Sequence, residues 1–230
     1  MESLKCYCCT HLNLAVQEQK HEPRYLGKYR HPSLNFLIHF MKTLREQKRH
    51  CRRQLSAQIQ QQHAQKVFKQ LKNQSFFKQN QKMALYLASD GELDPIYIAQ
   101  FATLNHQNVY LPVLHPFKKN QLWFCEWTDQ PLIKNKFNIA EPDYQQSPPL
   151  DLATLDLIFV PLTVFNIKGH RLGMGGGYYD RTLANIKNEK IRPLLIGLAH
   201  DCQKATDLNI QAWDIAMDHI ITEQHIYPNN

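Results

Sequence analysis

Apolar residues in this chain gather in short runs, and segments with the spacing of amphipathic helices lie between them. Runs of this length, rich in Leu, Ile and Val, are typical of strands buried on both faces of a parallel sheet. We expect such strands at residues 83–87, 109–113, 156–160, 193–199 and 219–222. Because these strands alternate with helical segments, the pattern predicts an α/β fold with a mostly parallel sheet.

Two helices are predicted ahead of the first strand. Leu44, Cys51 and Leu55 recur at helical spacing among basic residues, which indicates an amphipathic helix. Ser56 then offers a side-chain oxygen that can cap a second helix over residues 57–71.

The middle of the chain carries further turn and strand signals. Asp94 and Pro95 suit the N-cap and first position of a helix that ends near Leu104. Residues 121–127 alternate in polarity and predict a strand at an edge or in a hairpin. Residues 129–150 are rich in Pro, Asn and Gln, and we expect a long surface loop there.

Glycine is concentrated after the strand at residues 156–160. Five of the 8 glycines fall within residues 169–177, and residues 178–187 directly afterwards are expected to open a helix. Such a loop lets backbone N–H groups turn toward a ligand, and a helix N-terminus adds unpaired donors. Arg171 adds a full positive charge, so the segment suits a phosphate; the alternative is a tight loop that binds nothing. Asp180 can serve as the dipole partner of the helix or hold Mg²⁺ beside a phosphate.

The sequence around this loop resembles that of a known family. Residues 171–181 read R-L-G-M-G-G-G-Y-Y-D-R, which resembles the R-L-G-x-G-x-G-[YF]-Y-D-R signature of the 5-formyltetrahydrofolate cyclo-ligase family. Further matching motifs follow the family's order from about Met41 to the C-terminus, at residues 87–94, 110–113, 139–142, 156–161 and 213–214. Several motifs in register are more specific than one glycine loop.

The resemblance implies a fold and a reaction. The fold would be the three-layer α/β arrangement shared with ribose-phosphate isomerase and CoA-transferase relatives, with a mostly parallel sheet flanked by helices. The reaction would be the ATP-dependent closure of 5-formyltetrahydrofolate to 5,10-methenyltetrahydrofolate, with release of ADP and phosphate, through a phosphorylated formyl group (an iminophosphate). ATP as co-substrate, Mg²⁺ and a reduced folate are therefore the expected ligands.

Residue roles implied by the resemblance fall into four groups. Arg171 is the expected catalytic residue. Mg²⁺ is expected at Asp180 and Asp214. The folate is expected at Leu87, Glu92, Met174, Gly175, Gly176, Gly177 and Tyr178. ATP is expected at Lys42, Thr43, Leu44, Arg45, Arg171, Leu172, Gly173, Met174, Gly175, Gly176, Gly177, Tyr178 and Tyr179.

Several of these residues also have plain structural interpretations. Taken alone, Glu92 is an exposed carboxylate, Asp214 an ordinary loop carboxylate, and Tyr179 a core residue. Lys42 stands two residues before Leu44, where the family often has its lysine three before. Outside these groups, His200 near a strand end is either a base or a structural histidine.

The first forty residues differ from the rest. They lack helical and strand periodicity and the order of a signal peptide, and they hold half of the 6 cysteines. We hypothesise that residues 1–40 are a disordered extension or upstream sequence read as protein, and that residues 41–230 form a single domain. The scattered cysteines predict no disulfide framework, which fits a reducing cytoplasm.

The net charge of +7 comes from an excess of basic residues in one segment of the chain. Residues 41–72 carry nine basic side chains against Glu46 alone, and the simplest interpretation is a solvated helix face. No apolar run reaches the ~18 residues of a membrane span. We therefore expect neither nucleic acid nor membrane as a partner, and a monomer. Three alternatives stay open: a related enzyme with another substrate, a non-catalytic folate or nucleotide binder, and an RNA-binding module that uses the basic helix.

Overall fold

The computed structural model describes residues 34–79, 82–128, 130–186 and 189–228. The chain divides into two compact units, residues 1–40 and 41–230. Of the first unit only residues 34–40 are described, and they form the start of helix α2 (Leu34–Arg53). The helix therefore begins seven residues before Met41, within the segment expected to lack helical structure. Most of the predicted extension, residues 1–33, lies outside the described residues.

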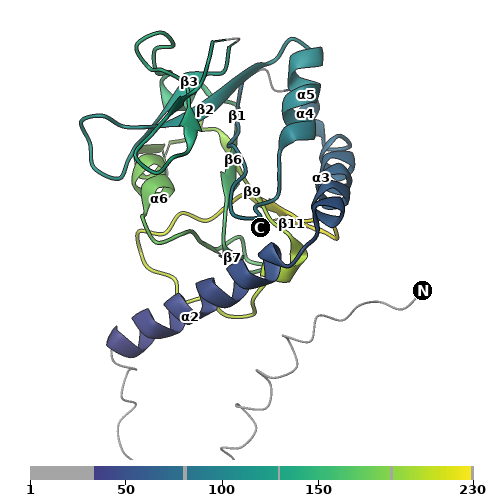
Figure 1. Ribbon diagram of the computed structural model, residues 1–230, viewed down its shortest axis with the longest axis vertical. Coiled ribbons are helices and arrows are strands. Elements are labelled where there is room, and N and C mark those ends of the chain that lie inside the picture. The colour runs from purple at the N-terminus through teal and green to yellow at the C-terminus, as the bar shows by residue number, and fades with distance from the viewer. Residues whose placement is uncertain (1–33, 80–81, 129, 187–188, 229–230) are drawn as a thin grey trace, which may run out of the picture. The chain divides into compact units, whose positions relative to one another are not determined.

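A seven-stranded sheet forms the centre of the second unit, with the order β11-β10-β9-β6-β1-β2-β3 (Figure 1). The five inner strands run parallel, while the edge strands β3 and β11 pair antiparallel with their neighbours. The mostly parallel α/β sheet predicted from the sequence is confirmed. The strand bounds are β1 Lys82–Ala84, β2 Asn108–Leu114, β3 Leu122–Glu126, β6 Leu157–Pro161, β9 Leu194–Leu198, β10 His219–Ile221 and β11 Ile226–Pro228.

Helices cover both faces of this sheet. Alternate residues of β6 belong to different cores: Leu157 and Phe159 pack with α3, α4 and α5, whereas Ile158 and Val160 pack with α6. Side chains of a strand alternate between the two faces, so this division gives three layers. Figure 1 shows α3, α4 and α5 on one side of the sheet and α6 on the other. Their bounds are α3 Ala57–Leu71, α4 Ser75–Gln79, α5 Ile96–Leu104 and α6 Tyr178–Leu183, and short 3₁₀ turns cover Leu152–Thr154, Ala184–Ile186 and Asp201–Gln203.

Helix starts agree closely with the sequence. Ser56 caps α3, where its hydroxyl accepts a hydrogen bond from the Ile59 N–H at 3.3 Å. The Asp94 carboxylate accepts from the Ile96 N–H at 3.0 Å, as expected of a capping residue. Pro95 is not the first helical residue, however, because α5 begins at Ile96. Across the described residues, none of the helices is both long enough and apolar enough to cross a membrane.

Two short ribbons were missed by the sequence analysis. The expected surface loop at 129–150 contains β4 (Ile133–Lys134) paired with β5 (Ala140–Glu141). Glu141 is buried, and its Oε2 accepts hydrogen bonds from the Leu114 N–H at 3.0 Å and from Asn135 Nδ2 at 2.8 Å. A buried, satisfied carboxylate fixes this segment against β2, and composition alone gives no sign of it.

The second ribbon pairs β7 (Val164–Phe165) with β8 (Arg171–Leu172). Arg171 is therefore part of a strand and not of the glycine loop itself. The segment expected to close the sheet at 219–222 is also not the last strand, because β11 follows it and pairs with β10.

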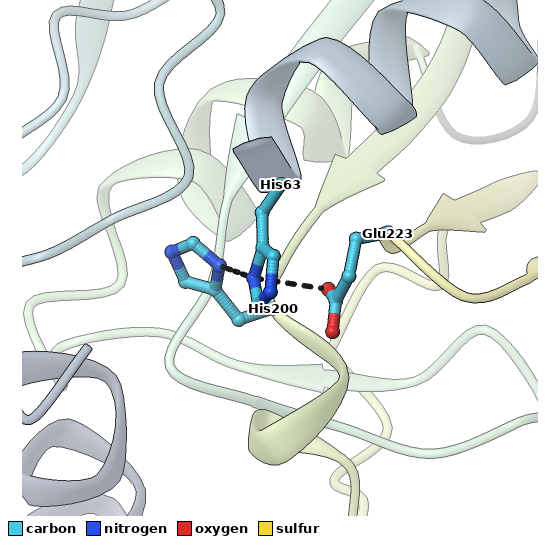
Figure 2. A group of neighbouring side chains, drawn as sticks. All are labelled: His63, His200 and Glu223. Carbon is cyan, nitrogen blue, oxygen red and sulfur yellow. Dashed lines mark hydrogen bonds and ion pairs between the residues drawn. The ribbon is translucent and has the colours of Figure 1, made fainter. Parts of the chain in front are cut away.

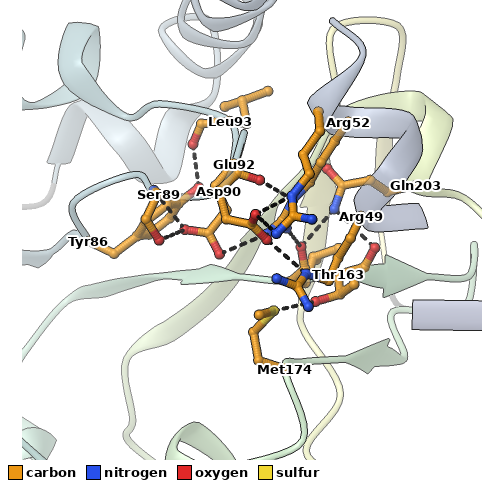
Figure 3. Close-up of polar contacts among 12 residues, drawn as sticks. Arg49, Arg52, Tyr86, Ser89, Asp90, Glu92, Leu93, Thr163, Met174 and Gln203 are labelled. Atoms are coloured by element: carbon orange, nitrogen blue, oxygen red, sulfur yellow. Dashed lines mark hydrogen bonds and ion pairs between the residues drawn. The ribbon is translucent and has the colours of Figure 1, made fainter. Parts of the chain in front are cut away.

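A buried arginine joins α2 to the loop after β1. Arg52 is fully buried, and its guanidinium donates to the Asp90 carboxylate at 3.0 Å, the Asp90 carbonyl at 2.9 Å and the Leu162 carbonyl at 3.2 Å (Figure 3). Arg49 and Arg53 bind the same Asp90 carboxylate. Three charges of the basic helix are thus held by one acid. The prediction of a solvated face is wrong for the fully buried Arg52, whereas the Arg53 side chain is 51% exposed.

Asp90 should stabilise the fold in a charge-dependent way. Burial raises its pKa, but the hydrogen bonds from the three arginines outweigh burial, and the pKa lies below its usual 3.8. Asp90→Asn keeps the size of the side chain and tolerates its φ of 54°. We expect the free energy of unfolding at pH 7 to fall by roughly 3 kcal/mol, because Arg52 loses its main partner.

Urea unfolding at several pH values measures this effect, with the exposed Asp207→Asn as control. A lowered carboxyl pKa stabilises the folded state above the unfolded pKa of about 4 and ceases to do so as the pH falls through the folded pKa. The difference between wild type and Asp90→Asn should therefore be full at pH 7 and shrink below about pH 4. Equal stability at pH 7 would rule out this role for Asp90.

Candidate functional site

The glycine loop lies between β8 and α6. Gly175 and Gly177 have φ values of 97° and 66°, a region that favours glycine over residues with a Cβ. Space beside Gly175 is open, with no atom within 4 Å of where a Cβ would stand. Helix α6 has six residues and continues directly into the 3₁₀ turn over Ala184–Ile186.

Two cavities meet at this loop. The first, of about 500 Å³, is walled largely by apolar side chains from the ends of β1, β2 and β6 and from the β4–β5 ribbon. The second, of about 600 Å³, lies between α2, the loop and residues 211–215. Four residues line both cavities, namely Arg171, Gly173, Gly177 and Asp180. A group bound in one cavity therefore lies close to a group bound in the other.

Arg171 lies at the junction of the cavities. Its side chain is buried, and Nη2 donates to Asp180 Oδ1 at 2.9 Å. Its Nε and the Tyr179 hydroxyl are buried without a hydrogen-bond partner among the described residues. Burial, together with the Glu92 charge, raises the pKa of Tyr179, so its hydroxyl stays protonated as a donor. Buried polar atoms without partners are uncommon, and both donors belong to residues that line the first cavity, where a ligand could accept from them.

Helix α2 contributes one of its predicted residues to the site. Arg45 Nε donates to the Gly173 carbonyl at 2.9 Å, and Arg45 lines the second cavity. Burial lowers the pKa of Arg45, and the Asp214 carboxylate partly offsets this. Lys42 instead points to solvent and lies 4.0 Å from Glu46. Lys42, Thr43 and Leu44 are not among the residues that line either cavity.

The two predicted metal ligands share the second cavity. Asp180 Oδ1 accepts from Arg171 and from the Ile215 N–H at 3.3 Å. Asp214 Oδ2 accepts from the Gln211 N–H at 2.8 Å, which closes a turn. Each carboxylate uses one oxygen in these bonds. Carboxylate oxygens are the donors that Mg²⁺ prefers.

Glu92 lies in the wall of the first cavity, and its interpretation as an exposed carboxylate is wrong. Its Oε2 accepts from the Ser89 N–H at 3.1 Å and the Ser89 hydroxyl at 3.3 Å, and Oε1 lies 3.6 Å from Arg52 (Figure 3). Burial raises its pKa, although the Arg52 charge acts in the opposite direction. Leu87 lines the same cavity, as predicted.

The β4–β5 ribbon contributes side chains that the sequence analysis did not single out. Phe137 and Ile139 line the first cavity, and the Phe137 ring packs edge-on against Tyr178 with 6.0 Å between centroids. Met174, from the loop, lines the same cavity, and its Sδ accepts a hydrogen bond from the Thr163 hydroxyl at 3.5 Å. Trp213, in the second cavity, is 69% exposed. An exposed aromatic beside a cavity is a signal that only the structure gives.

Comparison with known proteins assigns the chain. The model of the 5-formyltetrahydrofolate cyclo-ligase family matches residues 39–223. The chain belongs to this family. The 5-formyltetrahydrofolate cyclo-ligase of Haemophilus influenzae is 40% identical over 179 residues, which cover 77% of this chain and 95% of that protein. The 5-formyltetrahydrofolate cyclo-ligase of Escherichia coli K12 is 40% identical over 146 residues, which cover 63% of this chain and 79% of that protein.

Solved structures agree with this assignment. The 5,10-methenyltetrahydrofolate synthetase of Aquifex aeolicus has a TM-score of 0.70 at 29% identity and covers 82% of this chain and 92% of its own. The enzyme of the same name from Mycoplasma pneumoniae, at 24% identity, shares the fold with a TM-score of 0.63 over 79% of this chain and 98% of its own. The family motifs recognised in the sequence thus lie on the expected fold.

Within this family member, the predicted site residues separate into two groups. The structure brings together Arg45, Leu87, Glu92, Asp214 and the stretch from Arg171 to Asp180 around the two cavities. It does not bring Lys42, Thr43 and Leu44 there. His200 is fully buried away from both cavities, and burial together with the nearby His63 lowers its pKa to about 3. That environment favours the structural interpretation of His200 over a catalytic base.

Proposed function

We propose that this protein closes 5-formyltetrahydrofolate to 5,10-methenyltetrahydrofolate with consumption of ATP and release of ADP and phosphate. The family assignment supports the reaction, and one observation carries the mechanism. Two cavities of substrate size share Arg171, Gly173, Gly177 and Asp180. A reaction that transfers a group between two substrates needs this arrangement, since each substrate requires its own site and the reacting atoms must meet.

The first cavity suits the folate. Its apolar walls fit a flat heterocycle, and Phe137 and Tyr178 offer ring faces and edges at its mouth. A reduced pterin presents several N–H donors, and Glu92 supplies a buried carboxylate that can accept them. The hydrogen bonds from Ser89 hold that carboxylate in position before the substrate arrives.

The second cavity suits the nucleotide. The loop backbone from Gly173 to Gly177 can approach phosphate oxygens closely because glycine has no side chain in the way. Arg45 and Arg171 supply positive charge. The oxygen donors of Asp180 and Asp214 fit Mg²⁺, which when bound would neutralise phosphate charge. Exposed Trp213 offers a surface on which a base can stack.

The proposed chemistry needs positioning and charge balance more than covalent help. The formyl oxygen attacks the terminal phosphorus of ATP, ADP departs, and an iminophosphate forms. The side-chain nitrogen of the folate then attacks the formyl carbon, and phosphate leaves with the former formyl oxygen. Arg171 lies where the transferred group passes, so its guanidinium can stabilise the developing negative charge.

The proposed cytoplasmic setting rests on the sequence, whose scattered cysteines predict no disulfide framework. The expectation of a monomer that binds no nucleic acid stays a prediction. Three of the charges that could have served an RNA-binding surface are instead held by Asp90.

An absorbance assay tests the reaction directly. Purified protein is mixed with 5-formyltetrahydrofolate, Mg²⁺ and ATP, and the near-ultraviolet band of the methenyl product is followed. We expect the band to grow only when ATP is present, with one ADP released per product. A flat trace from folded protein that binds ATP would overturn the proposed substrate and favour a related enzyme acting on another one.

Arg171 should matter for turnover. We expect Arg171→Ala to lower kcat at least tenfold, because a buried positive charge at the transferred phosphoryl group is lost. Arg171→Lys should recover part of the rate, since it restores the positive charge without the planar guanidinium that bonds Asp180 and reaches the junction. Lys69→Ala, on the exposed face of α3, is the control for loss of a cation. A kcat within twofold of wild type in folded Arg171→Ala would exclude this role.

Glu92 should matter for the folate and not for ATP. We expect Glu92→Gln to raise KM for 5-formyltetrahydrofolate by roughly tenfold or more, the scale of a charge-assisted hydrogen bond. KM for ATP should stay unchanged. Since the Glu92 pKa is raised above 4.5, wild-type folate affinity should fall as acidification protonates the carboxylate, and the variant should lack this dependence. Glu126→Gln on β3 is the control, and equal effects on both substrates would contradict the assignment.

A further inference from the structure

Three side chains with metal-binding atoms meet on the α3 side of the sheet, apart from both cavities. His63 comes from α3, His200 follows β9, and Glu223 follows β10 (Figure 2). Because β9 and β10 are parallel neighbours, their carboxyl ends lie side by side, and α3 covers them. Figure 2 shows the two imidazole rings and the carboxylate turned toward one another.

The geometry of the three groups is compact. His63 Nδ1 lies 2.9 Å from His200 Nδ1 and 3.5 Å from Glu223 Oε2. The three ligand atoms all lie within 4.8 Å of one another. Ligands of a tetrahedral Zn²⁺ with bonds near 2.0–2.1 Å stand about 3.3 Å apart, so small side-chain rotations suffice to place an ion between them.

A single proton on one of the two imidazole rings cannot bond all three of these groups together. If His200 Nδ1 carries the proton and donates to His63, the His63 lone pair is used and the nearby Glu223 carboxylate gains nothing. If His63 Nδ1 carries the proton, it can donate to His200 Nδ1 or to the Glu223 carboxylate, but not fully to both. The acceptor that is not used then receives no hydrogen bond from His63. A metal ion in place of that proton accepts a lone pair from all three groups at once.

The surroundings prepare the groups for such an ion. His200 is fully buried, and the side chains of His63 and Glu223 are 16% and 5% exposed. The Asp201 N–H donates to Glu223 Oε2 at 3.0 Å, and a hydrogen bond of this kind orients a ligand in known metal sites. The Gln203 side chain accepts from the His200 backbone N–H at 2.9 Å, which fixes the backbone that carries the second ligand.

Charge around the cluster is balanced. Burial lowers the pKa of His63 and of His200. The Glu223 charge opposes this shift at His63, and the hydrogen bond that the His200 ring makes to the Gly91 backbone opposes it at His200, but neither reverses it. Both rings are therefore neutral at pH 7, the form that binds metals. Arg52 lies near His200, but Asp90 and Glu92 pair with it. Lys66 on α3 is the other cation that acts on His63.

We propose that His63, His200 and Glu223 form a binding site for a divalent transition-metal ion of the Zn²⁺ class. Two imidazoles and one carboxylate are borderline ligands that select Zn²⁺ and its neighbours over Mg²⁺, which prefers oxygen donors. The bound ion joins α3 to the ends of β9 and β10, and a water molecule completes its coordination. This site is separate from the Asp180 and Asp214 carboxylates and does not depend on the proposed reaction.

Zinc binding to the metal-free full-length protein tests the proposal. Titration with Zn²⁺ is followed by calorimetry in excess Mg²⁺, so that the hard oxygen site is occupied. We expect one Zn²⁺ per chain, and saturating Zn²⁺ should raise Tm by about 5 °C or more. Co²⁺ in place of Zn²⁺ should give the strong visible absorption of a four-coordinate ion.

Variants assign the ligands. His63→Ala and Glu223→Gln should each weaken Zn²⁺ binding at least tenfold and abolish the shift in Tm, the scale seen when a ligand or its support is lost. Glu223→Gln keeps an acceptor for the Asp201 N–H, so its fold should be retained. His50→Ala, an exposed histidine on α2, and Cys202→Ser are the controls and should bind Zn²⁺ like wild type. Absence of stoichiometric binding in wild type, or equal affinity in all variants, would overturn the site.

Discussion

The buried Arg52 guanidinium is the constraint on which the rest of this structure depends. A positive charge fully removed from water must be paired, and here its partners come from two parts of the chain: Asp90 and Glu92 in the loop after β1, and the Leu162 carbonyl after β6. These contacts join α2 to the loop after β1 and to the end of β6. The same loop carries Glu92 into the first cavity, and the same helix carries Arg45 to the glycine loop. One ion pair therefore positions both halves of the proposed site.

The two cavities are adjacent because they share part of their lining. Arg171 and Asp180 hold one another at 2.9 Å at the junction, and the loop glycines leave the backbone open on both sides. In a parallel sheet the carboxyl ends of the strands meet at one edge, so loops far apart in sequence surround one site. The β4–β5 ribbon, fixed through buried Glu141, adds a wall that is not part of the main sheet.

Much of this could be predicted because local sequence determines it. The apolar runs predicted the central strands, Ser56 predicted the start of α3, and the run of glycines predicted the loop before α6 where Arg171 and Asp180 meet. The missed ribbon at 133–141 is stabilised by a buried carboxylate that bonds to a distant strand, which composition does not show. The expected ATP contact of Lys42 stays a prediction, because its side chain is exposed beside Glu46 while Arg45 bonds the glycine loop.

The sequence by itself determined the family, the α/β class and the residue types at the glycine loop, because strand periodicity, caps and motif spacing act over a few residues. Only the tertiary structure decided which charges are neutralised and which groups meet. Arg49, Arg52 and Arg53 lie on one helix and are bound by an acid about forty residues away, and His63, His200 and Glu223 meet across most of the chain. Long-range pairing of this kind follows from burial and packing, which the spacing of residues along the chain does not encode.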